Sequence, residues 1–139
     1  MPYDEMMIMP MRADLTRLGI DELKSSGEVE SFLREPGARF VFLNSVCGCA
    51  AGQARPGLAL ALSNGSAKPA GMGTVFAGQD IDATARVRAD IHGEAPSSPS
   101  AAIFKDGQMV WFMPRKAFLN GTAEEVGRAF ESAFNEHCS

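Results

Sequence analysis

A chain of 139 residues has the length of one domain and can bury a hydrophobic core without disulfide or metal staples. Its composition, with 45% hydrophobic and 22% charged residues, is typical of a soluble globular protein. The net charge of −4 and the absence of a Lys/Arg cluster argue against a nucleic-acid-binding protein.

Residues 1–139 are predicted to form a single domain, because no repeat, low-complexity tract or long linker divides them. We assign residues 1–36 to an N-terminal helical extension and residues 37–139 to the core. The Met-rich segment at residues 6–9 is too short to span a membrane and lacks the cationic leader of a signal peptide. We therefore expect a cytoplasmic protein with no membrane partner, and the sequence leaves its oligomeric state open.

The extension contains two predicted helices. The first covers residues 4–18. The second covers residues 27–35 and is ended by Pro36. Ser25 and Glu28 have the spacing of a capping box at its start.

The core begins with a nearly continuous apolar run at residues 39–44, which predicts a central strand buried on both faces. The Ala- and Leu-rich stretch at residues 47–63 predicts a helix, with a kink or local break at Pro56. Residues 73–77 are predicted to form a second strand, and Asp80 to cap the helix that follows it.

Residues 101–105 and 108–113 predict two further strands, and the Asp-Gly pair between them is typical of a hairpin turn. Thr122 and Glu125 predict a capping box at the start of the last helix. The resulting order is β-α-β-α-β-β-α, in which the first two strands are parallel and the last two antiparallel. The predicted fold class is therefore α/β, thioredoxin-like, with a mixed four-stranded sheet flanked by helices.

The candidate active site is the Cys47-Gly48-Cys49 motif, which follows the first core strand. Three cysteines are too few for a secreted disulfide framework, so thiols this close together are expected to be reactive. Attack on a disulfide requires a thiolate, and the first turn of a helix favours the anion through its unpaired N–H groups and its dipole. Cys47 is therefore the predicted nucleophile, and Gly48 is expected to free the backbone at the substrate.

The sequence leaves two mechanisms open for Cys49. Residues two apart on an ideal helix have Cα atoms about 5.4 Å apart but point to nearly opposite sides. A disulfide between Cys47 and Cys49 would then be strained, labile and oxidising. Either Cys49 resolves the mixed disulfide, which we slightly favour, or an external thiol resolves it at Cys47.

Several segments of the chain, covering nearly its whole length, resemble the bacilliredoxin family: residues 44–52 with the Cys-Gly-Cys motif, 54–56, 75–80, 95–100, and the closing His137-Cys138. The resemblance implies a thioredoxin-like protein that removes bacillithiol from mixed disulfides on other proteins, or alternatively a general disulfide isomerase. Its implied partners are bacillithiolated or disulfide-containing proteins and a low-molecular-weight thiol. Bacillithiol would be a co-substrate, with no further cofactor.

The resemblance also implies further site residues. In thioredoxin-like folds a cis-proline faces the catalytic cysteine, and the residue before it offers backbone groups to the bound chain; Pro99 and Ser98 correspond to these positions. Bacillithiol carries a malate group, so the receiving site is expected to offer a cation. The candidates are Arg55, Arg115 and Lys105.

A non-catalytic metal-binding module is the alternative interpretation of the two neighbouring cysteines. Zinc prefers four ligands, and the remaining candidates are Cys138, His92 and His137. His137 and Cys138 lie at the far end of the last helix, so the tail would have to fold back. We predict no metal site. Cys138 is expected to be an exposed tail thiol, with a role as a redox accessory as the alternative.

Overall fold

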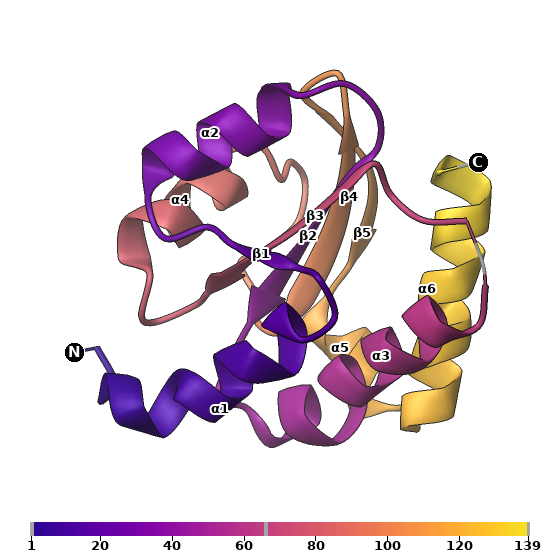
Figure 1. The fold of residues 1–139 in the computed structure, drawn as a ribbon, viewed down its shortest axis with the longest axis horizontal. Helices are drawn as coiled ribbons and strands as arrows, with labels where there is room; N and C mark the ends of the chain where they lie inside the picture. Colours follow the sequence, from indigo (N-terminus) through magenta and orange to yellow (C-terminus); the bar gives the residue numbers. More distant parts are fainter. Residues whose placement is uncertain (1, 66, 139) are drawn as a thin grey trace.

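A five-stranded mixed sheet forms the centre of the structure, with its strands in the order β1-β3-β2-β4-β5 (Figure 1). The structure is a computed structural model that describes residues 2–65 and 67–138. β2 is parallel to β3, which is parallel to β1, whereas β4 pairs antiparallel with β2 and β5 with β4. The strands are β1 (Asp21–Glu22), β2 (Arg39–Asn44), β3 (Gly71–Phe76), β4 (Ser100–Lys105) and β5 (Gln108–Met113).

The sheet has one strand more than the four that the sequence predicts. β1 comes from the N-terminal extension, where Asp21 and Glu22 pair with Gly73 and Thr74 of β3. A strand of two residues is too short to show any periodicity, so no sequence pattern reveals it. The extension is therefore part of the sheet as well as a helical addition to it.

Helices cover both faces of the sheet (Figure 1). α2 and α4 contribute to the apolar cluster on one face, whereas α1, α3, α5 and α6 contribute to the cluster on the other. The helices are α1 (Glu5–Thr16), α2 (Ser26–Arg34), α3 (Arg55–Ser63), α4 (Ile81–Ala89), α5 (Arg115–Leu119) and α6 (Ala123–His137), with the π-helical turn η1 (Ala50–Ala54) before α3.

Every residue of β2 is buried, as the apolar run predicts. Its side chains alternate between the two clusters, with Phe40 and Phe42 in one and Val41 and Leu43 in the other. The Phe40 ring meets that of Phe130 of α6 edge to face, with centroids 5.8 Å apart. Because packing holds β2 from both sides, the cysteine motif begins at a firmly held strand end.

The helix starts show where local sequence signals hold and where they fail. Thr122 and Glu125 form the predicted capping box at α6. Asp80 stands at the N-cap position of α4, as predicted, but its side chain makes no capping hydrogen bond. The carboxylate instead accepts two bonds from the Arg12 guanidinium, at 2.8 and 2.9 Å. It also accepts from the N–H of Phe76 at 3.0 Å. Asp80 thus ties the N-terminal helix to the end of β3.

The local break predicted at Pro56 is present. The π-helical turn η1 precedes α3, and the N–H of Arg55 donates to the carbonyl of Ala50. Pro56 has no N–H to continue the α-helical ladder at Gly52, so the change of hydrogen-bond pattern falls in the turn before the proline. The irregular turn comes directly after Cys49.

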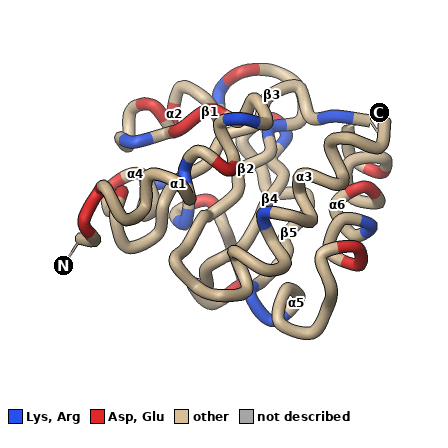
Figure 2. The backbone as a smooth tube through the Cα atoms, turned by 60° about the horizontal axis from the view of Figure 1, so that its bottom comes forward, with Lys and Arg blue, Asp and Glu red and all other residues tan. Residues whose placement is uncertain are grey.

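Charged residues of both signs are spread over the molecule. In Figure 2 the blue Lys and Arg segments and the red Asp and Glu segments are interspersed along the backbone. Within residues 2–65 and 67–138, no helix is long and apolar enough to cross a membrane.

Candidate active site

The chain leaving β2 is held by side-chain hydrogen bonds until it reaches the cysteine motif. Asn44 Oδ1 accepts from the N–H of Ser45 at 2.9 Å, and Ser45 Oγ accepts from the N–H of Cys47 at 3.0 Å. Both Asn44 and Ser45 are buried. Because buried polar groups require such partners, these bonds fix the backbone that carries Cys47.

Arg55 secures the same loop from the side of α3. Its Nη1 donates to Asn44 Oδ1 at 2.9 Å and to the Ser45 carbonyl at 3.1 Å, while its Nε lies 3.2 Å from Asp14 Oδ2 of α1. Arg55 is only 5% exposed. The expectation that Arg55 offers a cation to an incoming thiol is therefore wrong. Its guanidinium is buried and stabilises the loop.

Cys47 and Cys49 are free thiols whose sulfur atoms lie 2.8 Å apart. The expectation that the two side chains point to opposite sides is wrong, because Cys47 lies in a bend before the first helical turn and ideal helical spacing does not apply to it. Gly48 between them is exposed, and a Cβ added to it meets no atom within 4 Å. The two sulfurs are thus close enough to share one proton, and the space next to Gly48 is open.

The two thiols differ in exposure and acidity. Cys47 is partly exposed, whereas Cys49 is buried. The hydrogen bond with Cys49, followed by that with Arg115, lowers the pKa of Cys47 to about 7. Burial, followed by the hydrogen bond with Cys47, raises the pKa of Cys49. Near neutral pH, about half of Cys47 is therefore thiolate, whereas Cys49 stays a thiol that can donate to it.

Arg115 brings a positive charge to this pair. Its Nη2 lies 3.3 Å from the Cys47 sulfur, and the side chain is exposed. The thiolate in turn raises the pKa of Arg115. Arg115 is the first residue of α5, a five-residue helix that is absent from the predicted element order. Pro114, directly before it, is a local signal for a helix start. Of the three candidate cations, Arg115 is the one that contacts the cysteines.

The loop of residues 95–99, called the proline loop below, precedes β4 and lies at the same edge of the sheet as the cysteine motif. Leu43 near the end of β2 pairs with Ser100 at the start of β4, which places the preceding residues beside the end of β2. The peptide bond between Ser98 and Pro99 is cis. Ser97 links this loop to α5, because its hydroxyl accepts from the N–H of Arg115 at 3.3 Å. The structure thus brings together the predicted loop, the cysteines and α5.

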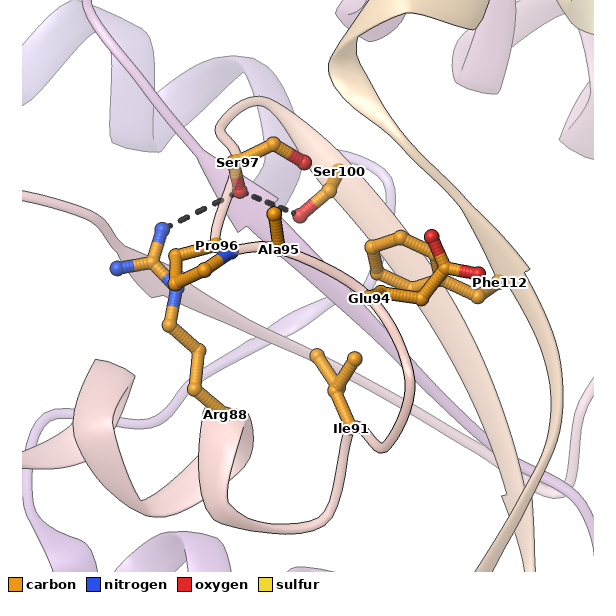
Figure 3. A pocket seen from close by; sticks show the side chains of 8 residues that line it. All are labelled: Arg88, Ile91, Glu94, Ala95, Pro96, Ser97, Ser100 and Phe112. Atoms are coloured by element: carbon orange, nitrogen blue, oxygen red, sulfur yellow. Dashed lines mark hydrogen bonds between the residues drawn. The ribbon is translucent and has the colours of Figure 1, made fainter.

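A cavity of about 30 Å³ lies behind the proline loop (Figure 3). Arg88 of α4 reaches the Ser97 carbonyl at 3.2 Å, and the same carbonyl accepts from the Ser100 hydroxyl at 2.8 Å. Arg88 Nε is buried and has no hydrogen-bond partner among the described residues. The cavity has room for one water molecule. Arg88 and Ser100 therefore fix the loop through the Ser97 carbonyl.

Cys138 lies at the opposite edge of the sheet. It lines a cavity with Ala38 and Lys105, next to the start of β2, whereas Cys47 follows the end of β2. The length of a six-residue strand, about 20 Å, separates the two edges. The expected exposed tail thiol is instead partly buried, and burial raises the pKa of Cys138. This separation argues against direct exchange with Cys47 and removes Lys105 from the candidate cations.

The alternative interpretation of Cys47 and Cys49 as metal ligands gains no further ligands from the described residues. In the part of the chain that the structure describes, no group of three or more His, Cys, Asp or Glu side chains is placed to hold a metal ion. His137 lines the far cavity with Cys138 and lies 3.1 Å from the carboxylate of Glu136.

The sequence of the whole chain is similar to known redox proteins. A family model described as "Disulphide isomerase" matches residues 3–138. A bacilliredoxin of Geobacillus kaustophilus is 44% identical over 137 residues, which cover 98% of this chain and 94% of the relative. A bacilliredoxin of Salinibacter ruber is 43% identical over 140 residues, covering 99% of this chain and 82% of the relative.

Solved structures show the same fold at low sequence identity. The thioredoxin of Malassezia sympodialis superimposes with a TM-score of 0.61 at 12% identity, covering 86% of this chain and 91% of that one. The thioredoxin-like domain of Arabidopsis NCP gives a TM-score of 0.55, also at 12% identity, with 86% and 79% covered. The thioredoxin-like fold class predicted from the sequence is therefore confirmed, with five strands in place of four.

Proposed function

This chain belongs to the bacilliredoxins, and we propose that within that family of thiol–disulfide oxidoreductases it removes bacillithiol, or a similar low-molecular-weight thiol, from mixed disulfides on cytoplasmic proteins. The observation that carries the proposal is the sulfur pair itself. A partly exposed thiol with a lowered pKa lies 2.8 Å from a buried thiol with a raised pKa. No cofactor beyond the thiol co-substrate takes part.

The first step is attack by the Cys47 thiolate on the mixed disulfide. A bond forms between the Cys47 sulfur and the sulfur of the small thiol, and the bond between the small thiol and the substrate protein breaks. The substrate sulfur leaves with the electron pair as a thiolate, so the step consumes no external oxidant or reductant. A pKa of about 7 suits Cys47 to this step, because about half of it is thiolate near pH 7.

The second step releases the small thiol from Cys47. Cys49 is placed to attack the Cys47 sulfur of the adduct, which forms a disulfide between the two cysteines and frees the small thiol. An external thiol attacking the same adduct regenerates reduced Cys47 directly. The contact between the sulfurs favours Cys49 as the resolving residue, while its burial and raised pKa slow its ionisation.

Gly48, Ser98 and Pro99 are proposed to receive the substrate chain. Open space over Gly48 lets a bulky disulfide approach the sulfurs. Ser98 and Pro99 belong to the loop at the same edge of the sheet as Cys47. We propose no catalytic role for Cys138, which lies at the other edge.

Adduct trapping tests the proposal. A Cys49→Ser variant is incubated with a protein that carries one bacillithiolated cysteine, and its intact mass is measured. We expect a gain of one bacillithiol, mapped to Cys47 by peptide analysis, while a matched Cys47→Ser variant gains none. Parallel reactions with glutathionylated and cysteinylated protein identify the preferred thiol. An unmodified Cys47 in all three reactions would refute the proposal.

General disulfide isomerisation is the second candidate function, and the description of the matching family model favours it. An isomerase attacks protein disulfides and must recover both cysteines in reduced form. Rescue of scrambled ribonuclease therefore measures it separately from bacillithiol release. Faster rescue than release per enzyme molecule would assign isomerisation as the main activity.

A further inference from the structure

Arg115 occupies an unusual position for a cation. Its backbone N–H is bound by Ser97 of the proline loop, while its guanidinium contacts the Cys47 sulfur. The guanidinium is exposed, and among residues 2–65 and 67–138 no carboxylate forms an ion pair with it. The Cys47 thiolate is therefore the anion that this cation faces.

No acidic residue of α5 competes with the Cys47 thiolate for Arg115. In Figure 2 the start of α5 is blue, because Arg115 and Lys116 are its first two residues, and α5 contains no Asp or Glu. The groups that face Cys47 are the Cys49 thiol and Arg115. A negative group brought close to Cys47 thus competes for this cation with the Cys47 thiolate and with no acidic side chain of α5.

Formation of the mixed disulfide removes the partner of Arg115. When Cys47 takes up a small thiol, its sulfur changes from an anion to a neutral disulfide sulfur, and the negative charge leaves with the substrate thiolate. The new sulfur lies about 2 Å from the Cys47 sulfur, a disulfide bond length away. A carboxylate of the incoming thiol can then replace the thiolate as the partner of the exposed guanidinium, which lies 3.3 Å from the Cys47 sulfur in the reduced state.

We infer that Arg115 is the catalytic counterion of this site and is transferred from the Cys47 thiolate to a carboxylate of the incoming thiol, which selects thiols that carry an anionic group. This inference rests on the proposed function and specifies its substrate class. When an external thiol attacks the sulfur of the small thiol, Cys47 leaves the mixed disulfide as a thiolate and regains Arg115; when Cys49 attacks the Cys47 sulfur, the small thiol leaves as the thiolate and Cys47 stays in a disulfide.

Small disulfides of matched size and different charge test the inference. In a Cys49→Ser background, which isolates the first step, Cys47 reacts with dithiodipropionate (anionic), hydroxyethyl disulfide (neutral) or cystamine (cationic), and adducts are followed by intact mass. Rates are divided by the measured thiolate fraction of Cys47, so that a changed pKa does not enter. For each disulfide, the rate of the Arg115→Gln variant is then compared with that of the parent.

We expect Arg115→Gln to slow the anionic disulfide about threefold relative to the neutral one, as for an exposed ion pair, and to speed the cationic one. Arg115→Lys should restore most of the discrimination, because it keeps the charge. High salt should abolish it. Lys116→Gln, which removes a neighbouring charge of the same helix, is the matched control and should leave the ranking unchanged.

Two different failures are distinguishable. If Cys47 of the parent forms no adduct with any disulfide, the proposed function fails and the inference with it. If adducts form but Arg115→Gln changes the three rates by the same factor, or not at all, the inference alone is overturned. Circular dichroism of each variant confirms that a uniform loss does not come from unfolding.

Discussion

The lowered pKa of Cys47 depends first on the hydrogen bond from Cys49, and replacing Cys49 tests this dependence. With a pKa of about 7, roughly half of Cys47 is thiolate near pH 7. An unperturbed cysteine with a pKa of about 8.5 is about 3% thiolate at that pH. The site therefore increases the reactive form roughly fifteenfold.

A Cys49→Ala variant removes the donor, whereas Cys49→Ser keeps a hydroxyl that can donate in its place. A hydrogen bond to a charged group stabilises it by about 1.5–3 kcal/mol, so we expect the pKa of Cys47 to rise by about one unit or more in Cys49→Ala. In Cys49→Ser it should stay closer to that of the parent. The two variants differ in one oxygen atom, so the serine variant is the control for lost packing.

The assay is the pH dependence of the thiolate ultraviolet absorbance and of alkylation by iodoacetamide, both in a Cys138→Ser background. The pH midpoint is a better readout than the alkylation rate at a single pH. A thiolate with a higher pKa is a stronger nucleophile, and on a logarithmic scale this offsets about half of the rate that is lost with the thiolate fraction. Equal midpoints near pH 7 in the parent, Cys49→Ala and Cys49→Ser would refute the hydrogen-bond origin of the shift.

Four further variants test the fold and the approach to the site. Gly48→Ala should raise stability to urea by about 0.5 kcal/mol, since the position is open and a Cβ restricts the unfolded chain, while slowing reaction with protein disulfides more than with small ones. Phe130→Ala should cost about 3–5 kcal/mol in urea denaturation, because a fully buried ring is lost from the core. Asp80→Ala should cost about 2 kcal/mol, because the buried Arg12 guanidinium loses its bidentate partner and keeps only the half-exposed carboxylate of Glu5. Thr122→Ala should lower the thermal midpoint through a loss of about 1 kcal/mol of capping energy.

For three of these variants, a specific outcome would contradict the reasoning. A uniform effect of Gly48→Ala on small and protein disulfides would mean that open space over Gly48 does not govern access. A loss below about 1 kcal/mol for Phe130 would place it outside the well-packed core. For Asp80, the double variant with Arg12→Met should recover much of the stability, and failure to do so would argue against the lost pairing of Arg12 as the cause.

Much of the fold is predictable because its signals are local. The continuous apolar run of β2, the capping box at Thr122 and the hairpin between β4 and β5 each depend on residues close together in the chain. Such patterns set the period, the start or the turn of an element without help from its neighbours. The sequence also suffices for the cysteine motif, because its position after a buried strand follows from the same patterns.

The arrangement of the site depends on contacts between distant residues. Arg115 lies 68 positions from Cys47, and α5, which presents it, is too short for a periodic signal. Ser97 receives its role from two arginines on different helices. These partners meet because strand order and register bring the end of β2 and the start of β4 to one edge.

The sequence by itself determined four of the five strands, the longer helices that cover the sheet, and the place of the two neighbouring thiols, Cys47 and Cys49, after a buried strand. Only the tertiary structure decided how those thiols share a proton, which of the three cations stands beside Cys47, and that Cys138 lies at the other edge. The physical reason is that secondary structure follows from short-range patterns, whereas the acidity of a thiol follows from the charges and donors that folding places within a few ångströms of it.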